Sequence, residues 1–93
     1  MQKIVINVCH GGFSLSWRAE ELYEKLSGKK VDYFYDIDRS DPHLVQVVEE
    51  LGVRANGVHA DLAIVEIPDG VQWEIAEYDG MEHVAEKHRR WYK

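Results

Sequence analysis

The stretch KIVINVCHGGFSLS, residues 3–16, constrains the fold more than any other part of the sequence. In its first half, alternate residues form one apolar face and one mostly apolar face, which is typical of a strand that is covered on both sides. Gly11 and Gly12 then predict a turn, and a helix is expected from Ser16. Such a turn exposes backbone N–H groups near a helix N-terminus, where the helix dipole favours an anion such as phosphate. A Gly-Gly turn without the fuller dinucleotide-binding or P-loop spacing is, however, more often a purely structural connection.

Apolar spacing and turn residues predict the order strand, helix, extended segment, helix, hairpin, helix. The expected elements are a strand at 4–9, a helix from Ser16 to Gly28, a short strand or extended segment at 31–35, a helix from Asp41 to Gly52, strands at 60–67 and 71–78, and a final helix from Met81 onward. Ser14 and Ser16 compete as the N-cap of the first helix. Pro68-Asp69-Gly70, between two alternating apolar runs, predicts a hairpin that joins the two later strands.

Because a hairpin forces antiparallel pairing, we expect an α+β fold with a small mixed or antiparallel sheet, made of the N-terminal strand and the C-terminal hairpin. About three helices would pack on this sheet. The 93 residues contain no linker, repeat or low-complexity tract, which predicts a single compact domain spanning residues 1–93. A domain of this size also favours oligomerisation as a source of stability.

The composition argues against several function classes. A formal net charge of −6 disfavours a binder of DNA or RNA polymers, which needs clustered Lys and Arg, but leaves open a small anionic ligand in a local pocket. Three Trp, five Tyr and two Phe exceed what a minimal core requires, so some are expected at an interface or a ligand site. No apolar run is long enough for a membrane span and no signal-peptide pattern opens the chain, so we expect a cytoplasmic protein without membrane contact.

Catalysis and metal binding are not expected. The single Cys9 rules out an internal disulfide and a cysteine metal cluster, and the sequence has no His-x-x-x-His pair or carboxylate cage. Cys9 alternates to the strand face of Val5 and Asn7, where burial as a small apolar residue is the simpler interpretation. Ser14 lies in no Gly-x-Ser-x-Gly elbow, and no histidine is placed beside it by spacing. We therefore expect no enzyme activity, no metal and no cofactor.

Two further regions offer side chains for an anionic ligand. His88 lies on the apolar stripe of the final helix, where it is either a hydrogen-bonded core histidine or a ligand residue. Arg89 and Trp91 combine a cation with a ring, which suits phosphate and base recognition, although charged residues also commonly end a helix. Arg39 lies in an acidic loop, where it either pairs with neighbouring carboxylates or is held by them to meet a phosphate.

A set of motifs along the chain resembles a widespread family of small bacteriophage and prophage proteins. The motifs are Lys3-Ile-Val-Ile-Asn7, Cys9-x-Gly-Gly-Phe-Ser-Leu-Ser16, Asp41-Pro-x-Leu-Val45, Val48-Glu-Glu-Leu-Gly52, Ala55-Asn-Gly57, Val65-Glu-Ile-Pro-Asp69, Trp73-Glu-Ile75, Glu77-Tyr-Asp-Gly80 and Ala85-Glu-Lys-His-Arg89-x-Trp91. The resemblance covers nearly the whole chain. This family is similar to phage anti-CBASS proteins, which evade immune signalling by sequestering signals such as 3′3′-cyclic GMP-AMP (3′3′-cGAMP) without cleaving them.

The resemblance implies a non-catalytic immune-evasion protein that acts in the cytosol of the host cell as a homo-oligomer, a tetramer by analogy. Its partner would be a cyclic oligonucleotide or a related nucleotide second messenger of bacterial anti-phage defence. The implied ligand-binding residues are His10, Gly11, Gly12, Phe13, Ser14, Ser16, Arg39, His88, Arg89 and Trp91. His10 stands where tyrosine is expected in relatives, which removes a base-stacking ring and leaves the exact ligand open. The alternatives are a protein-binding inhibitor of a host factor and an enzyme that degrades the signal.

Overall fold

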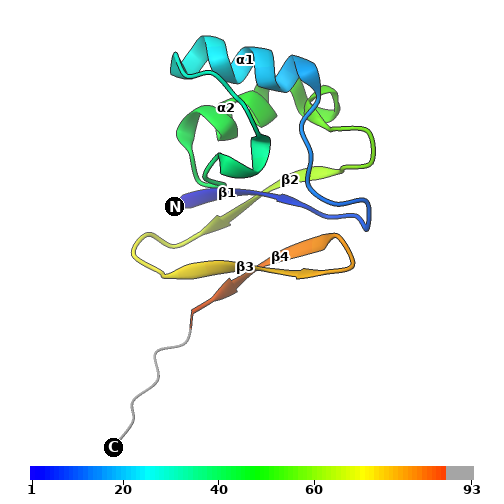
Figure 1. The fold of residues 1–93 in the computed structure, drawn as a ribbon. Coiled ribbons are helices and arrows are strands. Elements are labelled where there is room, and N and C mark those ends of the chain that lie inside the picture. Colours follow the sequence, from blue (N-terminus) through cyan, green and yellow to red (C-terminus); the bar gives the residue numbers. More distant parts are fainter. Residues whose placement is uncertain (88–93) are drawn as a thin grey trace, which may run out of the picture.

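Two helices lie on one side of a two-stranded ribbon, and a β-hairpin lies on the other side (Figure 1). The structure is a computed structural model, and it describes residues 1–87. Its elements are β1 (Gln2–Asn7), α1 (Trp17–Ser27), α2 (Pro42–Leu51), β2 (Leu62–Ile67), β3 (Trp73–Tyr78) and β4 (Met81–Glu86), with 3-10 turns η1 (Phe34–Asp36) and η2 (Gly52–Ala55). Both strand pairs are antiparallel, so the α+β class with an antiparallel arrangement is confirmed. None of the helices in this part of the chain is long and apolar enough to cross a membrane.

Local capping signals place both helices as predicted. Ser16, not Ser14, is the N-cap of α1, since its side-chain oxygen accepts a hydrogen bond from the first turn. Gly28 ends α1 in a left-handed conformation, with φ of 74°. Asp41 caps α2 by accepting the N–H of His43, and Pro42 occupies the first turn.

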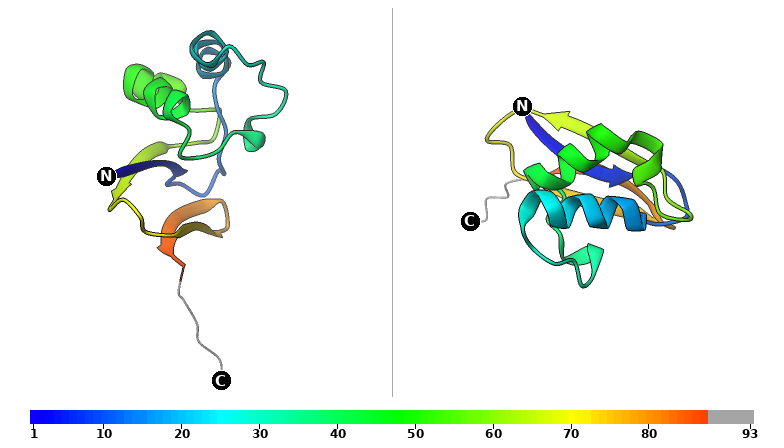
Figure 2. Two further views of the ribbon diagram at one scale, coloured as in Figure 1. Left: turned by 90° about the vertical axis from the view of Figure 1, so that its left-hand side faces the viewer. Right: turned by 90° about the horizontal axis from the view of Figure 1, so that it is seen from above.

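β1 is buried on both faces, as its sequence predicts. Val5 faces the helices and joins a core cluster made of Phe13, Leu15, Ala19, Tyr23, Leu44, Val45, Val47, Val48 and Ala55. Ile4 and Ile6 alternate to the opposite face, toward the hairpin, and are 0% and 3% exposed. The left view of Figure 2 shows the ribbon between the helices and the hairpin. Burial of each such side chain stabilises the fold by about 1.5–3 kcal/mol.

The predicted hairpin between the strands at 60–67 and 71–78 is wrong. β2 pairs with β1, in a register that runs from Gln2↔Ile67 to Asn7↔Leu62, and β3 pairs with β4. Asp79-Gly80 joins β3 to β4, and φ is positive at both residues, 51° and 89°. A two-residue turn of this geometry matches the right-handed twist of the paired strands. Pro68-Asp69-Gly70 therefore lies in a connection between the two sheets instead of closing one.

The predicted final helix is wrong over Met81–Glu86, which form β4. Glu82 is buried while Met81 and His83 are exposed, the two-residue period of a strand. The apolar spacing that suggested a helix was too short to separate the two periods. The remaining residues assigned to that helix, among them His88 and Trp91, lie outside the described residues. The segment at 31–35 is also not a strand, because it leads into the 3-10 turn η1.

Candidate functional site

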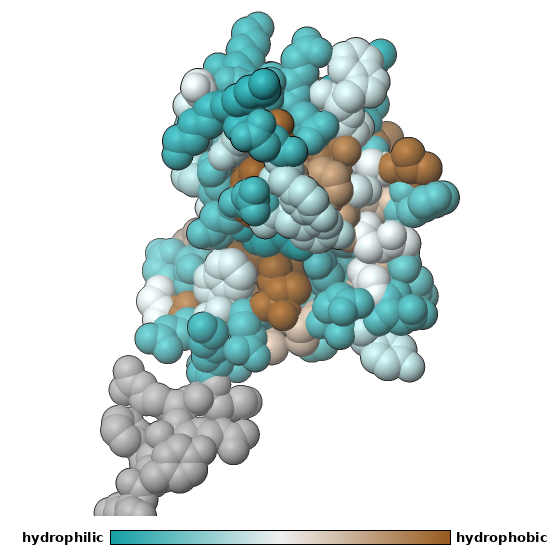
Figure 3. Space-filling model, viewed as in Figure 1, coloured by the Kyte–Doolittle hydropathy of each residue, from teal (hydrophilic) through white to brown (hydrophobic). Residues whose placement is uncertain are grey.

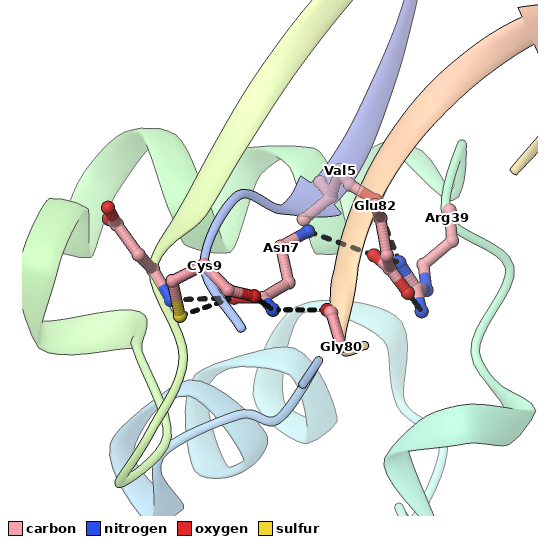
Figure 4. A network of polar contacts seen from close by, with 7 residues as sticks. Val5, Asn7, Cys9, Arg39, Gly80 and Glu82 are labelled. Atoms are coloured by element: carbon pink, nitrogen blue, oxygen red, sulfur yellow. Dashed lines mark hydrogen bonds and ion pairs between the residues drawn. The ribbon is translucent and has the colours of Figure 1, made fainter. Parts of the chain in front are cut away.

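The loop between β1 and α1 carries most of the predicted binding residues, and Asn7 holds it in place. Asn7 Nδ2 donates to the carbonyl oxygens of Cys9 and Gly80, at 2.7 and 2.8 Å, and Asn7 Oδ1 accepts the N–H of Asp61 at 2.7 Å (Figure 4). The side chain is fully buried. An amide offers two donors and an acceptor, so one residue fixes the loop, the hairpin turn and the start of β2.

Gly11 and Gly12 meet the steric requirements of this junction. A Cβ at Gly11 would overlap the carbonyl oxygen of His59, and Gly12 has φ of +89°. A Cβ at Gly80 would in turn overlap the backbone of His10. Three loops therefore meet here. Close packing at Gly11 and the positive φ of Gly12 together account for the glycine pair without a ligand.

The glycine turn and the helix N-terminus do not combine into one anion cradle. α1 begins at Trp17, after several more residues, and the Ser16 side chain accepts the N–H of Ala19 at 3.1 Å. The Ser16 hydroxyl also donates to the carbonyl oxygen of Arg54 at 2.7 Å. The carbonyl oxygen of Ser14 accepts a backbone N–H from residue 57. Both serines thus hold the loop against η2 and the turn that follows it.

Arg39 forms a bidentate ion pair with Glu82 of β4. Nη1 lies 2.6 Å from Oε1 and Nη2 lies 2.8 Å from Oε2. The two side chains are only 12% and 7% exposed. The sequence suggested a partner in the acidic loop around Arg39, or a phosphate. The carboxylate comes instead from the distant β4 and occupies both nitrogens that a phosphate would use.

Arg39 and Glu82 also form hydrogen bonds with the backbone groups along the edge of β1 that does not face β2. The N–H of Val5 donates to the carbonyl oxygen of Arg39 at 2.9 Å, and the carbonyl oxygen of Val5 accepts from Arg39 Nη1 at 3.2 Å. The N–H of Asn7 donates to Glu82 Oε1 at 2.9 Å. These backbone groups point away from β2, so two side chains stand where a further strand would otherwise bind.

Glu82 is ionised in this setting. Burial would raise its pKa, but hydrogen bonds from Arg39 and from the N–H of Asn7, together with the charge of Arg39, outweigh burial and hold the pKa of Glu82 below its ordinary value. The Arg39 guanidinium also lies over the ring of Phe13, with Cζ 3.5 Å from the ring centroid. Carboxylate, guanidinium and ring form one internal stack.

Phe13 is therefore a core residue. It is 2% exposed, and its ring centroid lies 5.8 Å from that of Phe34 and 5.9 Å from that of Tyr35. Base stacking on Phe13 would require the core to open. The neighbouring Tyr33 and Tyr35 are half exposed, and their centroids are 5.1 Å apart. Next to Phe13, the rings that a ligand could reach are therefore those of Tyr33 and Tyr35.

A pocket of about 330 Å³ adjoins this segment, beside the C-terminal end of α1 and the start of α2. Residues that line it include Tyr23, Lys29, Lys30, Tyr33, Asp36 and Asp41. The Tyr23 hydroxyl donates to Asp41 Oδ2 at 2.8 Å, and burial together with that carboxylate raises the pKa of Tyr23. Sequence reasoning missed this site. Two lysines directly after the helix-ending glycine, followed by three aromatic residues, were the available signal.

The other predicted site residues have no common location in the described part of the chain. His10 is exposed, and its Nδ1 lies 3.1 Å from the carbonyl oxygen of Asp79. His88, Arg89 and Trp91 lie outside the described residues. Within residues 1–87, no group of three or more His, Cys, Asp or Glu side chains is placed to hold a metal ion. No protein-family model, curated protein or solved structure matches this chain.

Proposed function

We propose that the protein binds a cyclic nucleotide signal of bacterial anti-phage defence, such as 3′3′-cGAMP, and sequesters it without cleavage. The observation that carries this proposal is the set of motifs, above all Cys9-x-Gly-Gly-Phe-Ser-Leu-Ser16, that resembles a family of small phage and prophage proteins. That family is in turn similar to phage anti-CBASS proteins. The protein would act as a homo-oligomer in the cytosol of the host cell.

The pocket beside η1 supports this proposal by its chemistry. Lys29 and Lys30 offer cations for phosphate groups, and the Tyr33 ring offers a surface for a base. A phosphate would have to bind at the lysine side of the pocket, because four aspartates also line it: Asp32, Asp36, Asp38 and Asp41. Asp36 can accept hydrogen bonds from guanine N–H groups or ribose hydroxyls. A volume of about 330 Å³ is near the lower limit of small-ligand sites. The pocket would therefore hold part of a cyclic dinucleotide, and a second subunit would supply the rest.

The family-implied surface around His10 and Gly11 is the other place where the ligand can bind, together with His88, Arg89 and Trp91. The proposal retains these five residues, together with Gly12 and Ser14, as candidate ligand-binding residues. It does not keep Phe13, Ser16 and Arg39, because their binding groups are engaged inside the protein.

Calorimetry with a panel of cyclic di- and trinucleotides tests the proposal. The expected result is saturable binding, followed by recovery of intact nucleotide after the protein is heat-denatured. Recovery of cleaved product would mean an enzyme, and absence of binding to the whole panel would overturn the proposal. Lys29→Glu with Lys30→Glu is expected to weaken nucleotide binding if the pocket is the site. His10→Ala is expected to weaken it if the loop between β1 and α1 is the site. Arg18→Glu with Lys25→Glu, an equal charge change at two exposed residues of α1, is the matched control.

A protein-binding inhibitor is the second candidate, favoured by a groove between α1 and the end of α2. Trp17, Leu22 and Leu51 line this groove of about 340 Å³, and Trp17 is 67% exposed. Exposed aromatic anchors are typical of protein interfaces. The face of the molecule in Figure 3 is mostly hydrophilic, with only small hydrophobic patches. A host-factor interface would therefore centre on the groove, and Trp17→Ala would abolish it without affecting nucleotide binding.

A further inference from the structure

The outer edge of β2 has backbone groups without partners in the described part of the chain. In an antiparallel pair, alternate residues turn their N–H and C=O groups toward the neighbouring strand. The N–H of Val5 donates to the carbonyl oxygen of Arg39, which shows that the backbone groups of Val5 point away from β2. The N–H of Val8 instead donates to the carbonyl oxygen of Asp61, across the strand pair. By this alternation Leu62, Ile64 and Glu66 point to the outer edge.

Only Leu62 has a partner there, since its N–H donates to Asn56 Oδ1 at 3.0 Å. The N–H and C=O groups of Ile64 and Glu66 make no hydrogen bond within residues 1–87. β1 covers the inner edge of β2, and no described strand lies along the outer edge. Unpaired strand edges are templates for another strand, unless charges, proline or bulges block them.

The β2 edge lacks such protection. Its sequence LAIVEI contains one charged residue, Glu66, and no proline or glycine. Lys3 lies opposite Glu66 in the register. The pKa of Lys3 is raised mainly by its hydrogen bond and ion pair with Glu49, and the charge of Glu66 adds to this effect, so Glu66 lies near a cation of the same chain. The outer edge of β3 also has no partner strand within residues 1–87, but β3 carries Glu74 and Glu77. β2 is therefore the edge that accepts a strand more readily.

We propose that two copies of the chain pair through their β2 edges, antiparallel, and form one continuous sheet β1–β2–β2–β1. A two-fold axis near Ile64 or Val65 places Glu66 opposite Leu62 or Ile64 of the second copy, never opposite the second Glu66. The strand is self-complementary in charge, and like charges do not face each other. This inference does not depend on the ligand. Failure of nucleotide binding leaves it intact. An oligomer that forms through another surface would overturn this pairing and leave the nucleotide proposal intact, whereas a strict monomer would also remove the second subunit that the nucleotide site requires.

Amide hydrogen exchange on the full chain, combined with native mass spectrometry, tests the pairing. We expect a dimer in which the N–H groups of Ile64 and Glu66 exchange slowly. After dilution toward the monomer, the same N–H groups should exchange faster. The N–H groups of Ile75 and Glu77, on the outer edge of β3, serve as the unpaired reference and are expected to exchange fast. A monomer at all concentrations would overturn the proposal, as would a dimer in which the Ile64 and Glu66 amides exchange as fast as the reference.

A substitution at Glu66 gives an independent readout. Its side chain is exposed and its N–H points outward, so Glu66→Pro removes one edge donor without removing a bond inside the monomer. Glu66→Thr changes the same side chain but keeps the N–H. Glu66→Pro is expected to raise the dimer dissociation constant at least tenfold, with an unchanged circular dichroism spectrum, whereas Glu66→Thr stays near wild type. Equal dissociation constants for the two variants would contradict pairing through this edge.

Discussion

Removal of the Glu82 carboxylate is the sharpest test of how this fold is held together. Glu82→Ala leaves the Arg39 guanidinium, 12% exposed, without its counter-ion, and leaves the N–H of Asn7 without its acceptor. Loss of one partner of a buried ion pair costs about 3–5 kcal/mol. Because a domain of this kind has only about 5–15 kcal/mol of stability, the variant would lose a large fraction of it.

Glu82→Gln keeps the experiment measurable if Glu82→Ala does not fold. Its amide oxygen still accepts the N–H of Asn7, but its charge is lost and its NH₂ group faces Arg39. We expect a loss of about 2–3 kcal/mol, in the range of hydrogen bonds to charged groups. Urea denaturation followed by far-ultraviolet circular dichroism would give this value from the midpoint at constant slope. Glu49→Gln is the control, because the pair of Lys3 with Glu49 is about half exposed and its loss should leave the midpoint unresolved from wild type.

The pH dependence of the same variants provides a second readout. The pKa of Glu82 is lower in the folded protein than its ordinary value of 4.5, so its contribution is complete above that value and is lost as the pH falls through the folded-state pKa. The wild type should therefore lose more stability between about pH 5 and 3 than Glu82→Gln. A Glu82→Ala variant within about 1 kcal/mol of wild type would refute the reasoning, since a buried guanidinium cannot lose its counter-ion at so small a cost.

Two further changes test the junctions around the candidate sites. Tyr23→Phe should cost about 1.5–3 kcal/mol in urea denaturation, because it removes the hydrogen bond to the Asp41 carboxylate, and it should abolish one late-ionising phenol in an alkaline titration at 295 nm. The contribution of Tyr23 to stability should be complete below the ordinary tyrosine pKa of 10.0 and should be lost as the pH rises from that value through the raised pKa of Tyr23. Gly11→Ala should destabilise the protein more than Gly12→Ala, because a Cβ at Gly11 meets the His59 backbone. Gly12 has open space around it, so Gly12→Ala should cost only about 1–2 kcal/mol for the positive φ. Equal losses of stability would contradict the packing argument.

Features that depend on neighbours in the sequence were predictable. Both helix starts and both helix ends follow from residues within the first or last turn, such as Asp41 and Gly28. Strand pairing depends on distant partners. The choice of β1 as the partner of β2 buries Ile4 and Ile6, which outweighs the local turn signal at 68–70. The Asp79-Gly80 turn was visible in the sequence, but its role depended on whether residues 81–86 formed a helix or a strand.

The site was less predictable than the fold for the same reason. The partner of Arg39 is 43 positions away, on a strand that was expected to be a helix, and no local motif marks it. Asn7 was a usable signal, because a polar residue in the middle of an apolar run has to find hydrogen bonds on burial. This requirement favours a structural junction at Cys9 and Gly11 over a ligand site there.

The distribution of cations decides where a phosphate can be bound. The chain has 11 Lys and Arg residues, and Arg39 is neutralised inside the protein. Lys29 and Lys30 are the exposed cations of the described pocket, and the last five residues contain three more, including Arg89. If Lys29→Glu with Lys30→Glu leaves nucleotide affinity unchanged, the cations of the C-terminal segment are the remaining clustered source of charge. Arg89→Glu should then weaken binding at least tenfold in calorimetry, and addition of salt should weaken wild-type binding more than that of the variant. Unchanged affinity in both variants would exclude phosphate pairing at either site and favour the groove at Trp17 as the functional surface.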